Sequence, residues 1–272
     1  GMTEELSFSF TSEKTLDKLG VPADSELRQA IPIMNPLTDE YPLIRTTLLT
    51  SVLENASRNV ARKNMDLRLF DIAPVFFPKA LPITELADEK LMVAGLITGR
   101  RNPIAWDTDN AMVDFYDLKG IVERFLTAIG VSKYTVERGE HFAMHPGKTA
   151  LFKKGRDVIA ILGEIHPSVA ANFDIPQSVC VFEMEVDTLL RYRKKRSAIA
   201  ALPKYPASTR DLAVLVDAGL TTAEIERVIA KKGGKFFRGA TLFDVYTGKQ
   251  VESGKKSMAF HLHFQSDDKT LT

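Results

Sequence analysis

The sequence predicts an α+β protein built from antiparallel sheets with helices, and it divides into two domains. Helical stripes alternate with runs typical of strands and hairpins over residues 1–190, and a basic, proline-containing segment at 191–206 then interrupts this pattern. Residues 203–272 have the order strand, helix, strand, strand. Short hairpin connections favour antiparallel pairing over a doubly wound parallel sheet.

The composition is that of a folded globular protein, with 272 residues, 44% of them hydrophobic and 26% charged. No apolar run approaches the roughly 20 residues that a membrane-spanning helix needs, and the N-terminus lacks a signal-peptide pattern. We therefore expect a cytoplasmic protein with no membrane partner. The single cysteine, Cys180, lies in the apolar run SVCVF, where a buried structural thiol is expected.

Charge is distributed unevenly along the chain. Residues 191–272 hold 16 Lys and Arg against 8 Asp and Glu, whereas the preceding residues hold 20 against 27. A basic tail on an acidic body indicates that the tail meets a polyanion, although a solvated surface without a partner would have the same composition. We place one domain at 1–196, a linker at 197–202 and a second domain at 203–272.

The elements of the first domain follow from the spacing of its apolar residues. A stripe at helical spacing predicts an amphipathic helix over 43–63. The other expected elements, in chain order, are strands at 65–78 and 90–99, a helix at 116–130, a hairpin at 149–167 and a strand at 178–190. Gly130 is expected to end the second helix, because glycine readily adopts the left-handed conformation that follows many helices.

The second domain predicts a βαββ unit. RDLAVLVD alternates as a strand, Thr221 and Glu224 have the spacing of a capping box at the start of a helix, and two strands follow. Alternate side chains of a strand point to opposite faces of a sheet, so one set should pack on the helix. That set is Leu212, Val214, Val216, Phe243, Val245, Met258, Phe260, Leu262 and Phe264.

The other side of this sheet should be open. The side chains expected there are Ala213, Leu215, Asp244, Tyr246, Ser257, Ala259, His261 and His263. Small residues, an aromatic ring and hydrogen-bonding groups on a basic domain are typical of platforms on which bases of single-stranded RNA stack. A plain solvated face is the alternative.

Two motifs are set aside. Gly147-Lys-Thr imitates the end of a phosphate-binding loop, but Phe142 stands where that loop needs a glycine, so HPGKT is expected to be a turn after a strand. His261 and His263 share a strand face without a cysteine or carboxylate cluster nearby, so no metal site is expected.

The sequence assigns no catalytic residue. No serine, histidine and acid set has a recognisable arrangement, and no carboxylate pair can be asserted from spacing. His145 and His166 each precede a proline and are expected at loop entries, where either could serve a subunit contact.

Several segments carry a family resemblance. YPASTRDLAVLVD, TTAEIERVIAKKGGKF, LFDVYTGK, GKKSMAF and the final TLT keep the order of the ferredoxin-fold anticodon-binding domain that ends the β subunit of bacterial phenylalanyl-tRNA synthetase. NPLTDEYPLIRTTLLTSVLENASRN, LRLFDIAPVFF, HPGKTA and GEIHP resemble the catalytic-like domain of that subunit. The resemblance covers nearly the whole chain. It implies a class II synthetase-like domain followed by a ferredoxin-like βαββ anticodon-binding domain.

This family resemblance implies an α2β2 ligase that charges tRNA(Phe) with phenylalanine, using ATP and Mg²⁺. In such an assembly the α subunit performs the chemistry, the β body packs against it, and the last β domain binds the anticodon. By resemblance, Asp244, Tyr246 and Ser257 match anticodon-contacting positions, and these three residues also fall on the predicted open face. Arg210, Lys256 and His261 lie near them in the sequence and are weaker candidates for contact with the anticodon.

The body departs from an active synthetase. LFDIAPVFFP resembles the strand of the second class II motif, but Phe77-Pro78 stands where the loop with its ATP-binding arginine would begin. We therefore expect a catalytically inactive body, whose 43–63 helix helps to build the subunit interface. A stand-alone RNA-binding protein and an independent adenylating enzyme with a diverged site remain alternatives.

The ends of the chain also depart from the family. The chain begins inside the β subunit, so the upstream domains, including the editing pocket, are expected to be missing. It stops at TLT, where the family continues into a second helix and a last strand. The anticodon-binding domain is thus expected to be incomplete, with a sheet edge that is mobile or covered by a neighbouring chain.

Overall fold

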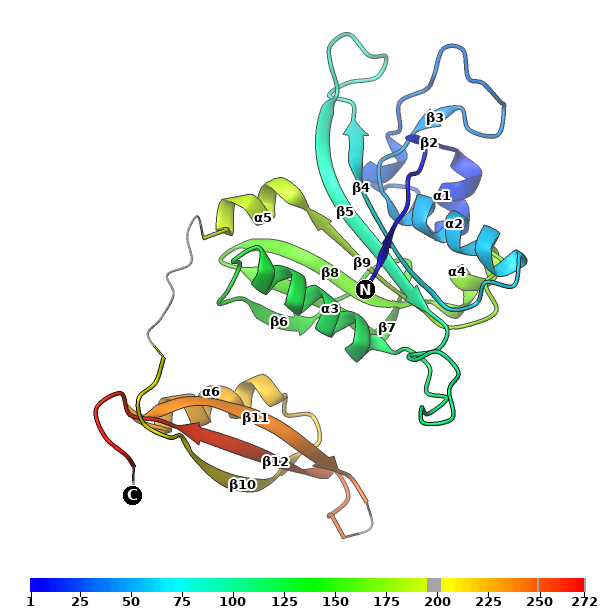
Figure 1. Cartoon of the computed structure of the whole chain (residues 1–272). Helices are drawn as coiled ribbons and strands as arrows, with labels where there is room; N and C mark the ends of the chain where they lie inside the picture. Colours follow the sequence, from blue (N-terminus) through cyan, green and yellow to red (C-terminus); the bar gives the residue numbers. More distant parts are fainter. Residues whose placement is uncertain (195–201, 249, 272) are drawn as a thin grey trace. The chain divides into compact units, whose positions relative to one another are not determined.

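A computed structural model describes residues 1–194, 202–248 and 250–271 (Figure 1). The chain forms two compact units, Gly1–Ser197 and Ala198–Thr272. Most of the linker expected at 197–202 lies outside the described residues, so the domain limits 1–196 and 203–272 stay predictions. No helix in the described ranges is long and apolar enough to cross a membrane.

The first unit is built on a seven-stranded sheet. In spatial order the strands are β1 (Thr3–Glu4), β4 (Leu67–Phe77), β5 (Asp88–Thr98), β9 (Val179–Glu185), β8 (Asp157–Ile165), β7 (Met144–Lys154) and β6 (Thr135–Arg138). Every neighbouring pair is antiparallel except β1 and β4, which run parallel. The predicted α+β class with a mainly antiparallel sheet is therefore confirmed for this unit.

Helices cover both faces of this sheet (Figure 1). One face packs against α1 (Glu13–Leu19), α2 (Leu49–Ala61) and α4 (Pro167–Asn172), and the other against α3 (Phe115–Ala128) and α5 (Val186–Tyr192). β9 serves both cores by alternation: Val179 and Val181 face the first set of helices, and Cys180 and Phe182 face the second. Cys180 is 1% exposed, as expected, and burial raises the pKa of its thiol to about 12.

The helix expected over 43–63 is shorter than predicted. Leu43–Ile44 instead form β3, which pairs with β2 (Phe10–Thr11), and α2 begins only at Leu49. Glu183 of β9 explains the start, because its carboxylate accepts hydrogen bonds of 2.9 Å from the Leu48 amide and from the Thr47 hydroxyl. Burial raises the pKa of Glu183. Leu49, Val52, Leu53, Ala56 and Val60 of α2 are buried within this unit, so the apolar stripe that they form is not open to a partner chain.

Most other predictions for this unit hold. Gly130 follows α3 with a φ of 81°, and β7 and β8 form the expected hairpin. The strand expected over 178–190 ends early, because Val186 begins α5. HPGKT was wrongly expected to be a turn, since it lies within β7 at an irregularity between Met144 and Thr149. His166 caps α4, accepting a hydrogen bond of 3.2 Å from the Ser168 amide.

The second unit has the predicted βαββ order. Its elements are β10 (Ser208–Asp217), α6 (Thr222–Lys232), β11 (Phe237–Tyr246) and β12 (Lys255–Phe264), and the antiparallel sheet has the order β10-β12-β11. Thr221 and Glu224 form the expected capping box. The core consists of Ile225 and Ile229 of α6 packed on Met258 and Phe260 of β12.

Candidate nucleic-acid interface

The central strand β12 defines the two faces of the three-stranded sheet. Met258 and Phe260 are 1% and 0% exposed beneath α6. The intervening residues therefore point away from the helix, to what we call the open face. On β12 the open face carries Ser257, Ala259, His261 and His263.

Strand pairing extends the open face to both neighbours. On β10, residues Leu215, Ala213, Asp211 and Thr209 lie opposite those four residues. On β11 the partners of Ser257, Ala259 and His261 are Tyr246, Asp244 and Thr241. Asp244, Tyr246, Ser257 and His261, all predicted from the sequence as site residues, therefore share one face.

Phe243 contradicts the predicted parity. The register shifts between Leu242, which pairs with buried Phe260, and Asp244, which pairs with Ala259. Such a β-bulge inserts one residue, so the side chains before it alternate out of step with those after it. Leu242 and Ala240 consequently pack on the helix, whereas Phe243 is 49% exposed and stacks on His261 of the open face.

Phe243 and His261 form an ordered cluster with Asp211. The two ring centroids are 4.0 Å apart and the ring planes differ by 16°. From the other neighbouring strand, the Asp211 carboxylate lies 2.6 Å from Nδ1 of His261. An imidazole held by a carboxylate on one side and a phenyl ring on the other is fixed in orientation before any ligand arrives.

Tyr246 lies at the end of β11, with its phenol ring against the turn that follows. The side chain is 42% exposed, and a methyl group added to Gly248 would overlap the phenol ring. Gly248 therefore permits the present position of the ring. The exposed Asp244 carboxylate lies two residues before Tyr246 on the same face, and carboxylate oxygens can accept hydrogen bonds from base amino groups.

Arg210 and Lys256 do not join this cluster. They pair with Leu262 and Val216 of the helix-facing set, so both lie on the opposite side of the sheet. The Lys256 ammonium group donates a hydrogen bond of 2.6 Å to the Leu220 carbonyl oxygen. Arg210 bonds to the Ser208 hydroxyl and the Thr209 carbonyl oxygen of its own strand, at 3.0 and 2.9 Å.

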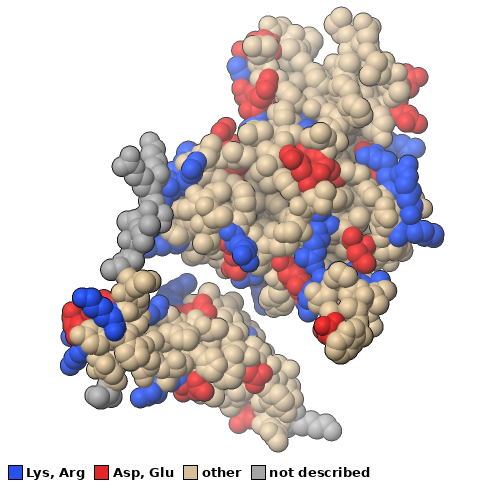
Figure 2. All heavy atoms as spheres, viewed as in Figure 1, with Lys and Arg blue, Asp and Glu red and all other residues tan. Residues whose placement is uncertain are grey.

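The positive charge of the tail is concentrated before the second unit. Residues 203–272 hold 11 Lys and Arg against 8 Asp and Glu, and the other five basic residues lie at 191–196. Figure 2 shows both signs of charge on the visible surface of each unit. A polyanion would therefore meet a modest positive charge on the sheet domain and a stronger one just before it.

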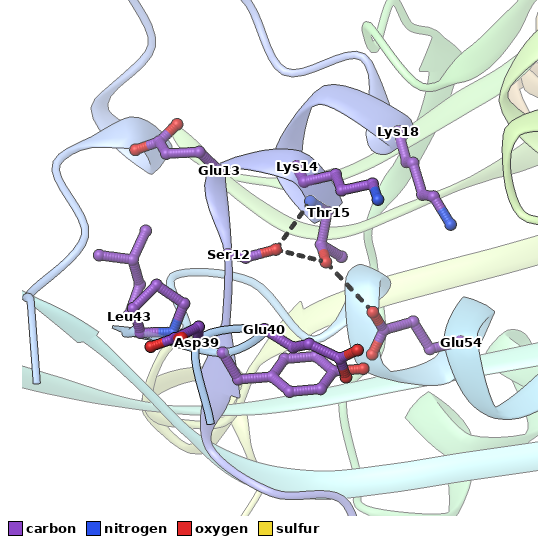
Figure 3. Close-up of a pocket in the computed structure, with 11 residues that line it drawn as sticks. Ser12, Glu13, Lys14, Thr15, Lys18, Asp39, Glu40, Leu43 and Glu54 are labelled. Carbon is purple, nitrogen blue, oxygen red and sulfur yellow. Dashed lines mark hydrogen bonds between the residues drawn. The ribbon is translucent and has the colours of Figure 1, made fainter. Parts of the chain in front are cut away.

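In the first unit, polar groups support the fold. A hollow of about 560 Å³ lies beside α1, and its lining carries both signs of charge (Figure 3). Ser12 caps α1 by accepting a hydrogen bond from the Thr15 amide, and the Thr15 hydroxyl donates one of 3.2 Å to Glu54, whose pKa is raised by burial.

No group of three or more metal-ligating side chains occurs in the described part of the chain.

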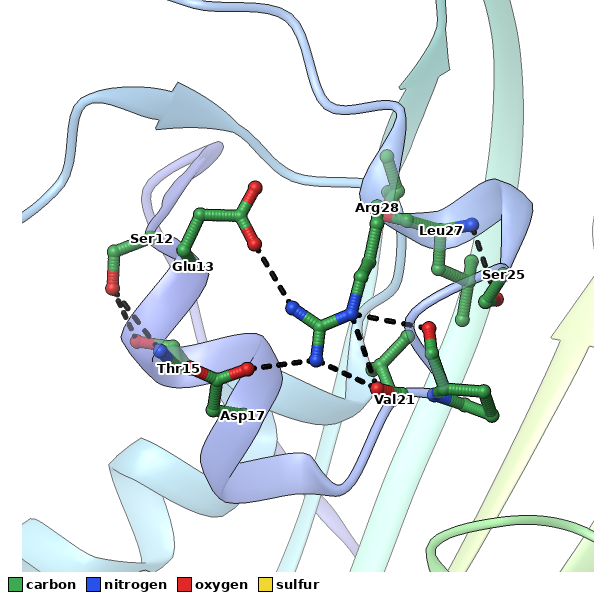
Figure 4. Close-up of polar contacts among 10 residues, drawn as sticks. Ser12, Glu13, Thr15, Asp17, Val21, Ser25, Leu27 and Arg28 are labelled. Carbon is green, nitrogen blue, oxygen red and sulfur yellow. Dashed lines mark hydrogen bonds and ion pairs between the residues drawn. The ribbon is translucent and has the colours of Figure 1, made fainter.

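Arg28 likewise has a structural role. Its guanidinium group contacts Glu13 at 2.9 Å and Asp17 at 2.7 Å, and it donates to the carbonyl oxygens of Val21 and Pro22 (Figure 4). These contacts tie the 20–28 segment to α1. With its nitrogens engaged in this way, Arg28 is not arranged to receive an anion.

Two known protein families match successive parts of the chain. Residues 1–186 match the family described as the phenylalanyl tRNA synthetase beta chain CLM domain, and residues 203–272 match the ferredoxin-fold anticodon binding domain. Among solved structures, the pyrrolysyl-tRNA synthetase from Desulfitobacterium hafniense is similar in fold, with a TM-score of 0.53 and 14% sequence identity. That similarity covers 70% of this chain and 62% of the other.

Curated relatives match over the whole chain. The phenylalanine–tRNA ligase beta subunits of Syntrophotalea carbinolica and Clostridium acetobutylicum are 38% and 39% identical over 273 residues, covering 100% of this chain. The matched region is 34% and 33% of those subunits. The chain thus spans about a third of the length of these relatives.

Proposed function

The chain belongs to the phenylalanyl-tRNA synthetase β-chain family, and from this membership we propose that it is the non-catalytic part of a β subunit that binds the tRNA anticodon. In this role it would support an α subunit within an α2β2 ligase that charges tRNA(Phe) with phenylalanine in the cytoplasm. The α subunit would hold ATP and Mg²⁺ and perform the reaction.

The open face of the second unit carries the proposal. It combines an exposed tyrosine ring, the Asp244 carboxylate and the Ser257 hydroxyl over a floor of small residues. An aromatic ring offers a stacking surface to an unpaired base, while carboxylate and hydroxyl groups can bond to base edges. Tyr246 would stack on an anticodon base, and Asp244 and Ser257 would contact polar edges of the bases.

A structural role for the first unit is supported by its interior. β4 ends at Phe77, followed by Pro78, and Phe77 packs beside the core of α2 with the Lys90 ammonium 4.7 Å from its ring centroid. Phe77 and Pro78 carry no guanidinium group with which to bridge a phosphate. The buried Asp71 carboxylate and the half-buried Glu183 carboxylate are engaged by neighbouring groups of the fold.

The contact with the α subunit would use exposed apolar loops rather than α2. Phe8, Met34 and Leu37 are 83%, 93% and 91% exposed near β2 and β3, and Leu86 is 89% exposed in the β4–β5 connection. Figure 1 draws the connection that leads into β3 and the β4–β5 connection at the same end of the first unit. Exposed apolar side chains gathered at one place are typical of interaction surfaces.

Binding of an anticodon stem-loop tests the RNA proposal. Tyr246→Ala should weaken binding of the tRNA(Phe) anticodon stem-loop by about 1 to 3 kcal/mol in a filter assay. Unchanged affinity would remove Tyr246 from the site. A stem-loop with a different anticodon serves as the matched RNA control.

Complex formation tests the subunit proposal. Mixing the chain with the α subunit should give a joint peak in size exclusion, and Leu86→Asp together with Met34→Asp should abolish it. The isolated chain should show no ATP–pyrophosphate exchange. Measurable exchange would indicate an adenylating enzyme, and RNA binding without any α complex would indicate a stand-alone RNA-binding protein.

A further inference from the structure

We propose that Phe243 is a second base-stacking side chain of the open face, serving a nucleotide next to the one on Tyr246. The Asp211–His261 pair acts as its positioning support. This inference rests on the proposed function, because it concerns how the same sheet face holds RNA.

A bulge in β11 places Phe243 on the open face. Alternation counted back from Val245, which pairs with buried Met258, would bury Phe243 beneath α6, but the register shift between Leu242 and Asp244 leaves Phe243 on the open face. The ring does not belong to the apolar core of the second unit and remains 49% exposed. A phenyl ring held at the surface presents the type of π-face on which bases of any sequence stack.

His261 and Asp211 hold the Phe243 ring from one side. His261 covers one face of the phenyl ring at a centroid distance of 4.0 Å, and Asp211 holds the imidazole through a contact of 2.6 Å. Because β11 is an edge strand, the other face of the ring points away from β12. A ring fixed in advance loses less conformational freedom when a base stacks on it.

The two aromatic residues of the open face lie on the same strand. Phe243 and Tyr246 are three residues apart on β11, and because the bulge at Phe243 shortens the strand, they lie less than about 10 Å apart along it. Ala213 and Ala259 lie opposite each other on the neighbouring strands, and their small side chains leave the surface low. Two aromatic rings on such a surface can receive successive bases of one single strand.

Fluorescent base substitution tests the proposal on the full chain. Anticodon stem-loops that carry 2-aminopurine at one loop position at a time report which base stacks on which ring. Phe243→Ala should weaken binding about 5- to 100-fold and remove quenching at one position. Tyr246→Ala should remove quenching at a neighbouring position. Phe243→Leu keeps an apolar side chain without a ring and should show the same lost quenching.

Matched variants separate stacking from fold. Val228, 60% exposed on α6, provides the control Val228→Ala, which should leave affinity and quenching unchanged. Asp211→Ala should reduce quenching at the Phe243 position only, and Asp211→Asn, which can still hydrogen-bond the imidazole, should restore it. Circular dichroism checks that each variant is folded.

The outcomes distinguish the two proposals. If Tyr246→Ala weakens binding and Phe243→Ala and Phe243→Leu do not, the role of Phe243 is overturned while the proposed function stands. If the unaltered chain binds no stem-loop, or neither aromatic residue affects binding, the proposed function fails and this inference fails with it.

Discussion

The Arg45 guanidinium lies 3.6 Å from the Asp71 carboxylate, and the two side chains are only 1% and 2% exposed. Ser7 hydrogen-bonds to both, and Arg45 also donates to the Pro74 carbonyl oxygen at 3.1 Å. The sequence Leu-Phe-Asp occurs at residues 69–71 and again at 242–244. The first copy places its aspartate in this buried ion pair, whereas the second turns its aspartate to the open face.

Breaking the buried pair should destabilise the first unit strongly. Asp71→Asn leaves the Arg45 charge buried without a counter-charge, so we expect a loss of about 3 to 5 kcal/mol in the free energy of unfolding. Chemical denaturation followed by circular dichroism measures it. Asp66→Asn is the control, since the Asp66–Arg100 pair has the same 3.6 Å separation but is exposed, and it should cost at most about 1 kcal/mol.

Glu5 should make stability fall as the pH rises. Burial, opposed by the Asn55 hydrogen bond, raises its pKa from 4.5 to about 7. Between these values the folded chain keeps a proton that the unfolded chain releases, so the contribution of Glu5 is present at low pH and lost as the pH rises through about 7. Glu5→Gln removes this dependence.

The difference between Glu5→Gln and the unaltered chain is the quantity to measure. From pH 5 to pH 8 the unaltered chain should lose on the order of 2 kcal/mol more than the variant. Burial lowers the pKa of His141 to about 4, so the contribution of His141 to stability increases as the pH rises. His141 is present in both proteins, so its contribution cancels in the difference. Parallel pH profiles would contradict the prediction.

Gly248→Ala should impair RNA binding through Tyr246. The added methyl group overlaps the phenol ring, so the ring must move. We expect a several-fold loss of stem-loop affinity and no further loss when Tyr246→Ala is combined with it, because both changes remove the same contact. Gly239→Ala on the same strand, where a methyl group meets no atom within 4 Å, is the control.

Adjacent residues of β12 should have separable effects. Lys256→Ala removes the bond to Leu220 on the helix side and should destabilise the second unit by about 1 kcal/mol with little change in stem-loop affinity. Ser257→Ala should lower affinity and leave stability almost unchanged, since it lies on the open face opposite Tyr246. The reverse pattern in melting and filter-binding measurements would show that the face assignment is wrong.

Sequence reasoning recovered much of the proposed site, because alternation along a strand is a local property. Asp244, Tyr246, Ser257 and His261 were assigned to one face by counting, and strand pairing confirms that placement. Phe243 was missed because a bulge depends on how two strands pair, and no residue at 242–244 has the φ > 0 signature of a glycine bulge. Position on a face is confirmed, and RNA contact by these residues stays a prediction.

The sequence by itself determined the α+β class, the order of most elements, the βαββ unit and the buried Cys180, because hydrophobic periodicity and capping residues act within a few residues of each other. Tertiary structure alone decided where α2 begins and which aromatic ring reaches the open face. Glu183 caps α2 from 135 residues away, and Asp211 holds His261 across 50 residues. Such contacts form only when distant strands pair, so local periodicity cannot encode them.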